Sequence, residues 1–160
     1  MLALTHVIAD VAVAALRTEA DLTPKPGLVD ARGSGAHVDM TRQTLHDSAE
    51  ALREAFAECA AAAVQFEMGS QLRMRIGVIG REGERRMLAA TGGVNTHRGA
   101  LWALGLLSAG AARSGVTAEA IGFAAALAAI PDPASRERLS HGQDARRRYG
   151  ARGAAGEAQG

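Results

Sequence analysis

The chain has 160 residues, a net charge of +1, and a composition that is 48% hydrophobic but only 3% aromatic. This apolar content excludes a disordered chain, and the near-zero charge gives no general reason to expect nucleic acid as a partner. No apolar run of about 18 residues is free of charge and glycine, so we expect no membrane span. The one cysteine permits no internal disulfide and favours a reducing, cytoplasmic location.

The first predicted helix covers residues 4–20. Its core-facing stripe is predicted from apolar residues at helical spacing, namely Val7, Ile8, Val11, Ala14, Ala15 and Leu16. Glu19 lies at the C-terminal end of this helix, where an acidic group opposes the helix dipole. Its carboxylate is therefore predicted either to meet a cation or to be exposed to solvent.

Two loops follow that helix. Residues 23–30 (Thr-Pro-Lys-Pro-Gly-Leu-Val-Asp) cannot be helical, because each proline forces the residue before it into an extended conformation. This stiff segment, which we call the strap, is expected to hold Lys25 and Asp30 in fixed places. A second polar loop follows at residues 33–40, where His37 and Asp39 are two residues apart. Such a pair is either a local hydrogen bond or a metal or catalytic pair.

A long helix is predicted over residues 41–68, and a more charged one over residues 72–90. The first has a single apolar stripe with spacings of three and four residues, made of Leu45, Ala49, Leu52, Phe56, Cys59, Ala63 and Phe66. Asp39 or Thr41 is expected to cap its start, and Gly69 to end it. The second contains several arginines, most expected in surface ion pairs and some facing phosphates: Arg73, Arg75, Arg81, Arg85 and Arg86.

Residues 91–99 (Thr-Gly-Gly-Val-Asn-Thr-His-Arg-Gly) form the most distinctive segment, which we call the central loop. Its adjacent glycines accept positive φ angles and allow a ligand to approach the backbone closely. Asn95 or Thr96 is expected to cap the following helix, whose N-terminus would then be an anion site. His97 adds a titratable group and Arg98 a planar cation. A capped helix start without a ligand is the alternative interpretation.

The remaining helices are the most apolar. Residues 100–112 are apolar on nearly all sides, as is typical of a helix at the centre of a bundle, and a further Ala-rich helix is predicted over residues 117–130. No convincing strand pattern is present. We therefore predict an all-α fold, a compact helical bundle with long glycine- and proline-containing functional loops. Residues 1–134 form the predicted helical domain, and residues 135–160 a charged, glycine-rich tail.

Three segments of the chain resemble the motifs of a known family. They are residues 23–30, residues 35–40 (Gly-Ala-His-Val-Asp-Met) and residues 87–99, in which Met-Leu-Ala-Ala precedes the central loop. In order and spacing they are similar to triphosphoribosyl-dephospho-CoA synthases. These all-helical enzymes make the prosthetic-group precursor for the acyl carrier subunits of citrate lyase and malonate decarboxylase. The likeness covers the whole chain and continues more weakly within the tail, through residues 140–142, 149–150 and 153–158.

The resemblance implies a transferase reaction. Ribose C1′ of ATP would be transferred to the 2′-hydroxyl of 3′-dephospho-CoA, adenine would leave, and the triphosphate would stay on the sugar. His97 or His37 is then the implied proton-transfer group, with Asp39 as a further catalytic candidate. A Mg²⁺ ion bound with the ATP would be held by Asp30, Asp39 and Glu84. The implied ATP and substrate contacts are Lys25, Gly27, Gly92, Gly93, Asn95, Thr96, Arg98 and Gly99.

The chain departs from the family in two respects. Family members usually carry arginine where Ala155 stands, and they continue past Gly160 with an Asp/Asn/His-rich helical segment. We therefore expect this chain to be an incomplete enzyme with little activity of its own. Its uncovered apolar surface is expected to cause self-association as a dimer or larger assembly. The sequence of residues 101–107 leans toward the malonate decarboxylase pathway, while the citrate lyase pathway stays open.

Two other classes of function remain open from the residues. A metal-dependent phosphohydrolase would gather His37, His46, Asp47 and His97 into a metal cluster, but then the strap and the central loop would have no role. A non-catalytic helical module would leave every loop purely structural. Incubation with ATP and dephospho-CoA separates the three classes, since only the transferase releases adenine and only the hydrolase releases phosphate.

Overall fold

The computed structural model describes residues 2–115 and 117–134, so the predictions for residues 135–160 lie outside the described residues. The described ranges contain helices joined by loops: α1 (Leu2–Asp21), α2 (Arg42–Ala51), α3 (Arg53–Gln65), α4 (Ser70–Ala90), α5 (Arg98–Ser114) and α6 (Thr117–Ala129). The prediction of an all-α fold is confirmed. None of these helices combines the length and the apolar character that crossing a membrane requires.

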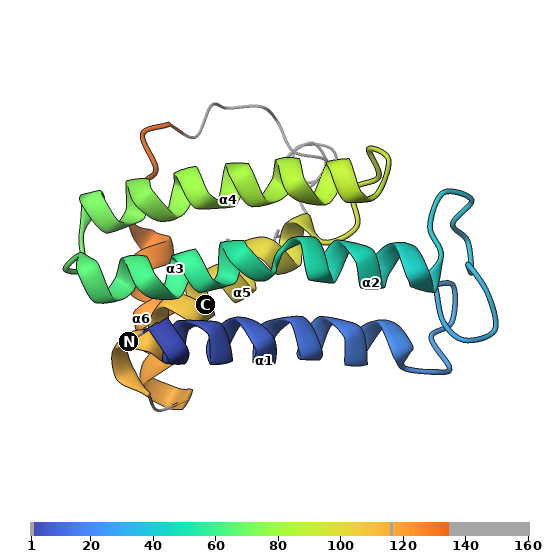
Figure 1. Ribbon diagram of the computed structural model, residues 1–160, viewed down its shortest axis with the longest axis horizontal. Helices are drawn as coiled ribbons and strands as arrows, with labels where there is room; N and C mark the ends of the chain where they lie inside the picture. The colour runs from blue at the N-terminus through green and yellow to red at the C-terminus, as the bar shows by residue number, and fades with distance from the viewer. Residues whose placement is uncertain (1, 116, 135–160) are drawn as a thin grey trace, which may run out of the picture.

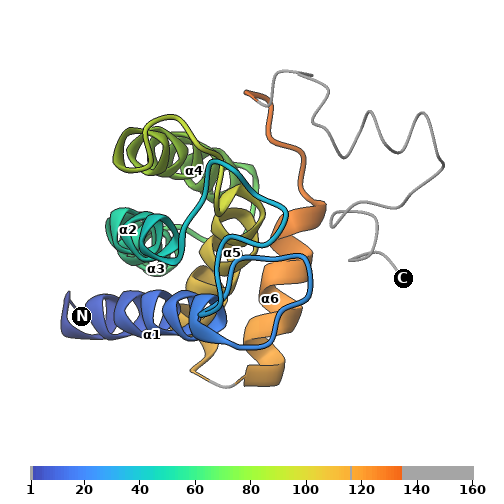
Figure 2. The same ribbon diagram turned by 90° about the vertical axis from the view of Figure 1, so that its right-hand side faces the viewer.

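The bundle is built around α5. This helix packs against α1, α3, α4 and α6, as the sequence predicts for the helix that is apolar on nearly all sides. Figure 1 shows α1, the consecutive pair α2 and α3, and α4 running beside one another. In Figure 2, α5 lies between this layer and α6. The loops that follow α1 and α4 both lie at the end of the bundle where α2 begins (Figure 1).

The helix predicted over residues 41–68 is divided in two. Between α2 and α3, Leu52 keeps nearly helical backbone angles, with φ −88° and ψ −10°. Its N–H bonds to the carbonyl of Ala49 at 3.3 Å, one residue nearer than in an α-helix, which tightens the chain locally. Of the two caps predicted for the start of this segment, Asp39 and Thr41, the structure uses Thr41, which shares a reciprocal capping box with Thr44.

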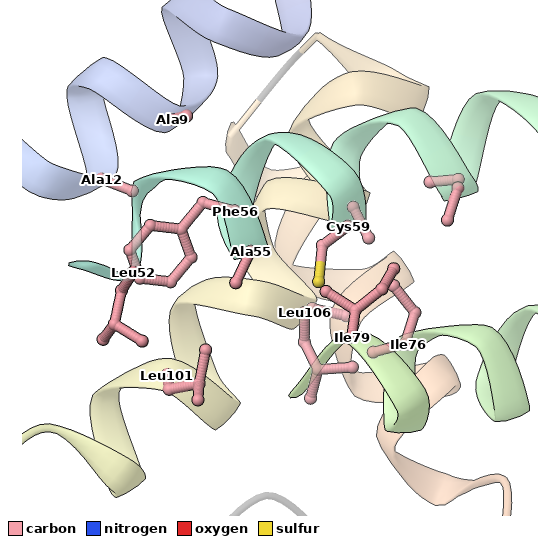
Figure 3. Close-up of a cluster of buried hydrophobic side chains, with 14 of the residues drawn as sticks. Ala9, Ala12, Leu52, Ala55, Phe56, Cys59, Ile76, Ile79, Leu101 and Leu106 are labelled. Carbon is pink, nitrogen blue, oxygen red and sulfur yellow. The ribbon is translucent and has the colours of Figure 1, made fainter. Parts of the chain in front are cut away.

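The stripe predicted for this segment is confirmed and forms the middle of the core. All its members from Leu45 to Ala63 are buried, and Phe66 is partly buried. Figure 3 shows Cys59 of α3 among apolar side chains of α4 and α5, including Ile79 and Leu106. Burial raises the pKa of Cys59 to about 12, so the thiol stays neutral and packs as a small apolar group.

The stripe predicted for the first helix is mostly wrong. Val7 and Val11 are 55% and 64% exposed, and Ala14 and Ala15 are exposed as well. The buried face consists of mainly smaller residues: Thr5, Ala9, Ala12, Val13, Leu16 and Ala20. Small side chains let α1 approach α3, as Figure 3 shows for the alanines of this face. Close packing between helices, rather than side-chain size, decides which face of α1 is buried.

Candidate active site

The strap is held in shape by the buried carboxylate of Asp30. Its Oδ2 accepts hydrogen bonds from the Lys25 N–H at 2.9 Å and from Nε and Nη2 of Arg32 at 3.0 and 2.7 Å. Its Oδ1 accepts from the Arg32 N–H at 2.8 Å. The Arg32 side chain, together with these N–H groups, keeps the pKa of Asp30 well below its usual range. Asp30 therefore fixes the loop from within, and both of its oxygens already have partners.

Lys25 turns back from the strap onto the end of α1. Its Nζ donates to the main-chain oxygen of Glu19 at 2.9 Å and to Oε1 of Glu19 at 3.2 Å. The unfavourable position of Glu19 at the helix end is thus explained by a partner cation. Lys25 also lines an open hollow of about 280 Å³, here called the strap hollow, with Gly27, Leu28, Asp30, Arg32, Gly33 and Gly35.

His97 is buried where the central loop meets α5. Its Nδ1 lies 2.8 Å from Oγ of Ser48 on α2, and that hydroxyl lies 2.5 Å from Oγ1 of Thr96. Its Nε2 is buried and has no hydrogen-bond partner within the described part of the chain. Burial lowers the pKa of His97, the Glu19 carboxylate raises it, and the Lys25 ammonium lowers it. The net shift is downward, so the imidazole is neutral at pH 7.

The strap and the central loop lie at the same end of the bundle (Figure 1). Glu19 accepts hydrogen bonds from Nζ of Lys25, and the charges of both groups shift the pKa of His97. The loops that carry Lys25 and His97, which the sequence marks in separate motifs, therefore lie at one end of the bundle (Figure 1).

After α4, the central loop begins with two glycines whose backbone angles are ones that other residues rarely adopt. The φ angles are +64° at Gly92 and +93° at Gly93, and the N–H of Gly93 bonds to the Leu88 carbonyl at 2.7 Å. A Cβ at either glycine, or at Gly99 in the first turn of α5, would contact nothing within 4 Å. Open space therefore lies beside the backbone at the positions predicted for substrate contact.

The prediction that Asn95 or Thr96 occupies the cap position of α5 is wrong. The N-cap is His97, and its side chain makes no capping bond. The Thr96 hydroxyl pairs with Ser48 instead, while Oδ1 of Asn95 accepts from the N–H of Arg98 at 3.3 Å. The loop thus uses its polar side chains to join α2 to α5 and to meet the first residue of α5.

A second hollow, the interhelical hollow, lies between α4 and α5 and has a volume of about 290 Å³. Arg98 and Glu84 form an ion pair at this hollow. Two further arginines line the hollow. Nη1 of Arg81 donates to Oδ2 of Asp132 at 2.8 Å, and Nε of Arg73 donates to the main-chain oxygen of Ile130 at 3.0 Å. Its lining is Cys59, Arg73, Ile76, Gly77, Gly80, Arg81, Glu84, Arg98, Leu101, Trp102, Gly105, Leu106 and Asp132. Arg98 therefore belongs to a different hollow from Lys25.

The carboxylates predicted to bind Mg²⁺ are not gathered in one place. Asp30 is enclosed by the strap, Glu84 pairs with Arg98, and Asp39 lies 3.9 Å from Nδ1 of His37 on a partly exposed loop. Over residues 2–115 and 117–134, no group of three or more His, Cys, Asp or Glu side chains is placed to hold a metal ion. These residues do not form a ready-made magnesium site.

The histidines proposed for a phosphohydrolase are also not gathered. Nε2 of His46 donates to Oδ1 of Asp21 at 2.9 Å, and Nε of Arg17 donates to Nδ1 of His46 at 3.5 Å. His97 is buried against Ser48. The described residues therefore do not support the cluster which that alternative needs.

Sequence reasoning missed Ser48. The signal that would have found it is its place on the buried face, three residues after Leu45 and four before Leu52. A serine among apolar stripe positions needs a hydrogen-bond partner, but the sequence does not say that this partner is His97.

Comparison with known proteins identifies the protein family. Residues 5–160 match the model of the CitG family, described as ATP:dephospho-CoA triphosphoribosyl transferase. Because the match covers nearly the whole sequence, the chain belongs to this family. The resemblance drawn from the strap, the second polar loop and the central loop is confirmed.

Individual relatives agree with this assignment. Three carry the name probable 2-(5''-triphosphoribosyl)-3'-dephosphocoenzyme-A synthase. The Pseudomonas fluorescens Pf0-1 protein is 55% identical over 160 residues, covering 98% of this chain and 55% of the relative. The Stutzerimonas stutzeri A1501 protein is 54% identical, covering 95% and 54%, and the Azotobacter vinelandii DJ protein is 52% identical, covering 98% and 56%. The chain thus spans about half the length of these relatives. No solved structure matches it.

Proposed function

We propose that this protein serves the reaction for which its family is named, moving the triphosphoribosyl group of ATP to the 2′-hydroxyl of 3′-dephospho-CoA and releasing adenine. The observation that carries the proposal is that the loops bearing Lys25 and His97 lie at the same end of the bundle (Figure 1), with the Lys25 charge acting on the pKa of His97. A cation suits the triphosphate, and a neutral imidazole suits the attacking hydroxyl. The names of the family and of the relatives support the same reaction.

The proposed step forms one bond and breaks one. The 2′-oxygen of dephospho-CoA bonds to ribose C1′, the bond from C1′ to the adenine nitrogen breaks, and its electron pair leaves with adenine. The base removes the hydroxyl proton and adenine gains one, so protons balance. His97 suits the role of base because its lowered pKa leaves it neutral at pH 7. His37, with Asp39 beside it, is the second candidate.

Lys25 is proposed to bind the triphosphate by exchanging its partner. Its present contacts are with the main-chain oxygen and the side chain of Glu19. The Glu19 side chain is 56% exposed, but that of Lys25 is only 11% exposed, so these contacts contribute more than an exposed ion pair. A triphosphate offers more charge than one carboxylate, and this compensates for the loss of the Glu19 contacts.

The interhelical hollow is proposed to hold an adenosine phosphate. Its apolar floor and Trp102 suit a purine ring, and the guanidinium groups of Arg73, Arg81 and Arg98 suit phosphates. Both substrates carry an adenosine phosphate, so binding of each should be measured separately. Trp102 is the only tryptophan in the chain, so its fluorescence reports which substrate enters this hollow.

Four finer assignments are part of the proposal. Mg²⁺ would arrive with ATP, held mainly by phosphate oxygens and at most one or two carboxylates, for which the exposed Asp39 is a candidate. The product would serve malonate decarboxylase or citrate lyase, in the cytoplasm. Self-association is supported by an exposed apolar face on α1, where Leu4, Val7 and Val11 are 51%, 55% and 64% exposed.

The test is adenine release. The 160-residue chain, and the same chain extended by the unmatched part of the Pseudomonas fluorescens relative (the extended protein), are each incubated with ATP, Mg²⁺ and dephospho-CoA. The extended protein is expected to release adenine only when both substrates are present, and the shorter chain little or none. Phosphate release in place of adenine would indicate the hydrolase, and no reaction by the extended protein would contradict the proposal.

A further inference from the structure

Ser48 is a buried polar residue that none of the motifs explains. It is fully buried on α2, its Oγ lies 2.8 Å from Nδ1 of His97, and it lies 2.5 Å from Oγ1 of Thr96. A serine hydroxyl has one proton to donate and can accept from others. In two arrangements the serine proton is itself hydrogen-bonded at these distances, and they place the His97 proton on different ring nitrogens.

In the first arrangement, Ser48 donates to Thr96 and accepts from an Nδ1–H of His97, which leaves Nε2 with a lone pair. In the second, Thr96 donates to Ser48, Ser48 donates to Nδ1, and the proton is on Nε2. Nε2 is buried without a hydrogen-bond partner in the described ranges. An orphaned buried N–H is rarer than an under-satisfied acceptor, so the first arrangement is favoured.

We propose that Ser48 is a positioning residue that holds the proton of His97 on Nδ1, so that Nε2 presents a lone pair to the attacking 2′-hydroxyl. This rests on the proposed function, in which His97 is the base. A buried polar atom without a partner calls for an explanation, and a proton acceptor that meets its partner only in the substrate complex supplies one. Because Nε2 is buried, the hydroxyl reaches it only after the surrounding loops move apart.

The groups around His97 come from several elements. Glu19 at the end of α1 and Lys25 of the strap act on its charge with opposite signs. Ser48 of α2 holds Nδ1, and Sδ of Met87 on α4 lies 3.3 Å from the His97 main-chain nitrogen. Among these neighbours only Ser48 contacts a ring nitrogen, so the identity of the protonated nitrogen depends on the serine.

A merely structural role would be to join α2 to α5. In that case, removing the hydroxyl would lower stability and leave the histidine tautomer and the catalytic pH profile unchanged. A positioning role changes both. Ser48→Ala removes the acceptor for Nδ1–H. Thr96→Val keeps Ser48 but removes its acceptor, which frees the serine proton to turn toward Nδ1.

The first experiment is nitrogen NMR of the histidine side chains in the 160-residue chain and its variants at pH 7.5. We expect the Nδ1–H form of His97 in the unmodified chain, and a shift toward the Nε2–H form in both Ser48→Ala and Thr96→Val. Ser108→Ala is the matched control, a buried serine on α5 about 16 Å further along the helix, and should leave the His97 signals unchanged. An Nε2–H form in the unmodified chain, or unaltered signals in both variants, overturns the proposal.

The second experiment uses the extended protein. Ser48→Ala is expected to lower kcat about ten- to hundredfold with KM nearly unchanged, less than loss of the base itself, and to move the acid limb of the pH profile to lower pH. An unchanged kcat and pH profile would overturn the positioning role. If the unmodified extended protein releases no adenine, the proposed function fails, whereas the NMR result still decides which nitrogen Ser48 controls.

Discussion

The strap and the central loop lie at the same end of the bundle (Figure 1), but they are held in different ways. The strap closes on itself, since Asp30 binds Arg32 and the strap's own backbone, and the Thr23 hydroxyl accepts from the Ala31 N–H at 3.1 Å. The central loop depends on other elements, through Ser48 of α2 and a helix-capping position without a side-chain cap. The strap is therefore held mostly by contacts between residues close in the chain, including that of Lys25 with Glu19, whereas the central loop joins α2 to α5.

The largest expected effect is at the residue that couples the central loop to the bundle. His97→Gln should lower turnover of the extended protein by about a hundred- to ten-thousandfold, the usual contribution of a positioned base. The structure adds a cost in stability of about 0.5–1.5 kcal/mol, because the variant removes the buried hydrogen bond between Ser48 and His97. Adenine release and urea denaturation measure the two effects. Turnover that survives within a few-fold, together with its loss in His37→Gln, would transfer the role to His37.

The second effect compares Gly35 of the second polar loop, which packs against the strap, with Gly92 of the central loop. Gly35, beside the strap, has φ +59°, and a Cβ there would lie 2.5 Å from the Leu28 carbonyl oxygen. Gly92 of the central loop has φ +64° but open space around it. We expect Gly35→Ala to cost about 2–4 kcal/mol from backbone strain plus overlap, and Gly92→Ala about 1–2 kcal/mol from strain alone. Urea midpoints measure both, and equal costs would contradict the structure of the strap.

The third effect concerns ATP binding at the strap. Lys25→Ala should weaken ATP binding by about tenfold or more, because a charge-assisted contact to phosphate is lost. Stability should also fall, by about 1 kcal/mol, since the largely buried ammonium of Lys25 binds the main-chain oxygen of Glu19. High salt should reduce the difference between the two proteins. The matched control is Arg85→Ala, which removes an exposed cation from α4 outside both hollows and should leave the Kd for ATP unchanged.

The smallest effect is a difference in pH dependence between the two regions. The pKa of His97 is lowered in the folded chain, so its unfolded form takes up a proton first, and the stability it contributes is lost as pH falls below about 6.5. The pKa of Asp30 is also lowered, so its contribution is present above about pH 4 and is lost as pH falls further. Unfolding free energies should show these separate windows. His97→Gln should reduce the pH dependence of the unfolding free energy only in the range below about pH 6.5 that His97 controls. Asp30→Asn should reduce it only in the range below about pH 4.

The strap and the helices were the predictable parts, because their signals are local. Prolines fix the strap, glycines fix the positive φ angles, and the helix bounds follow from apolar spacing. The division at Leu52 was not predictable, since no residue there breaks a helix. The buried face of α1 was wrongly predicted because Val7 and Val11 are larger than the alanines that touch α3.

The candidate site was predictable only as a set of residues. The motifs identified Lys25 and His97, but their proximity depends on how α1, α2 and α5 pack. The separation of Arg98 from Lys25 into different hollows and the contact of Ser48 with His97 are likewise tertiary, and no spacing in the sequence encodes them.

The alkylation rate of the buried cysteine can report how often the packed helices open. Cys59 is the only thiol in the chain, lies in the lining of the interhelical hollow, and has a pKa raised to about 12. A thiol reacts with alkylating reagents as its thiolate, so labelling in the folded state is limited to moments when α4 and α5 separate and water enters. The rate of alkylation therefore counts those openings, and a nucleotide that fills the hollow should slow it in proportion to its occupancy.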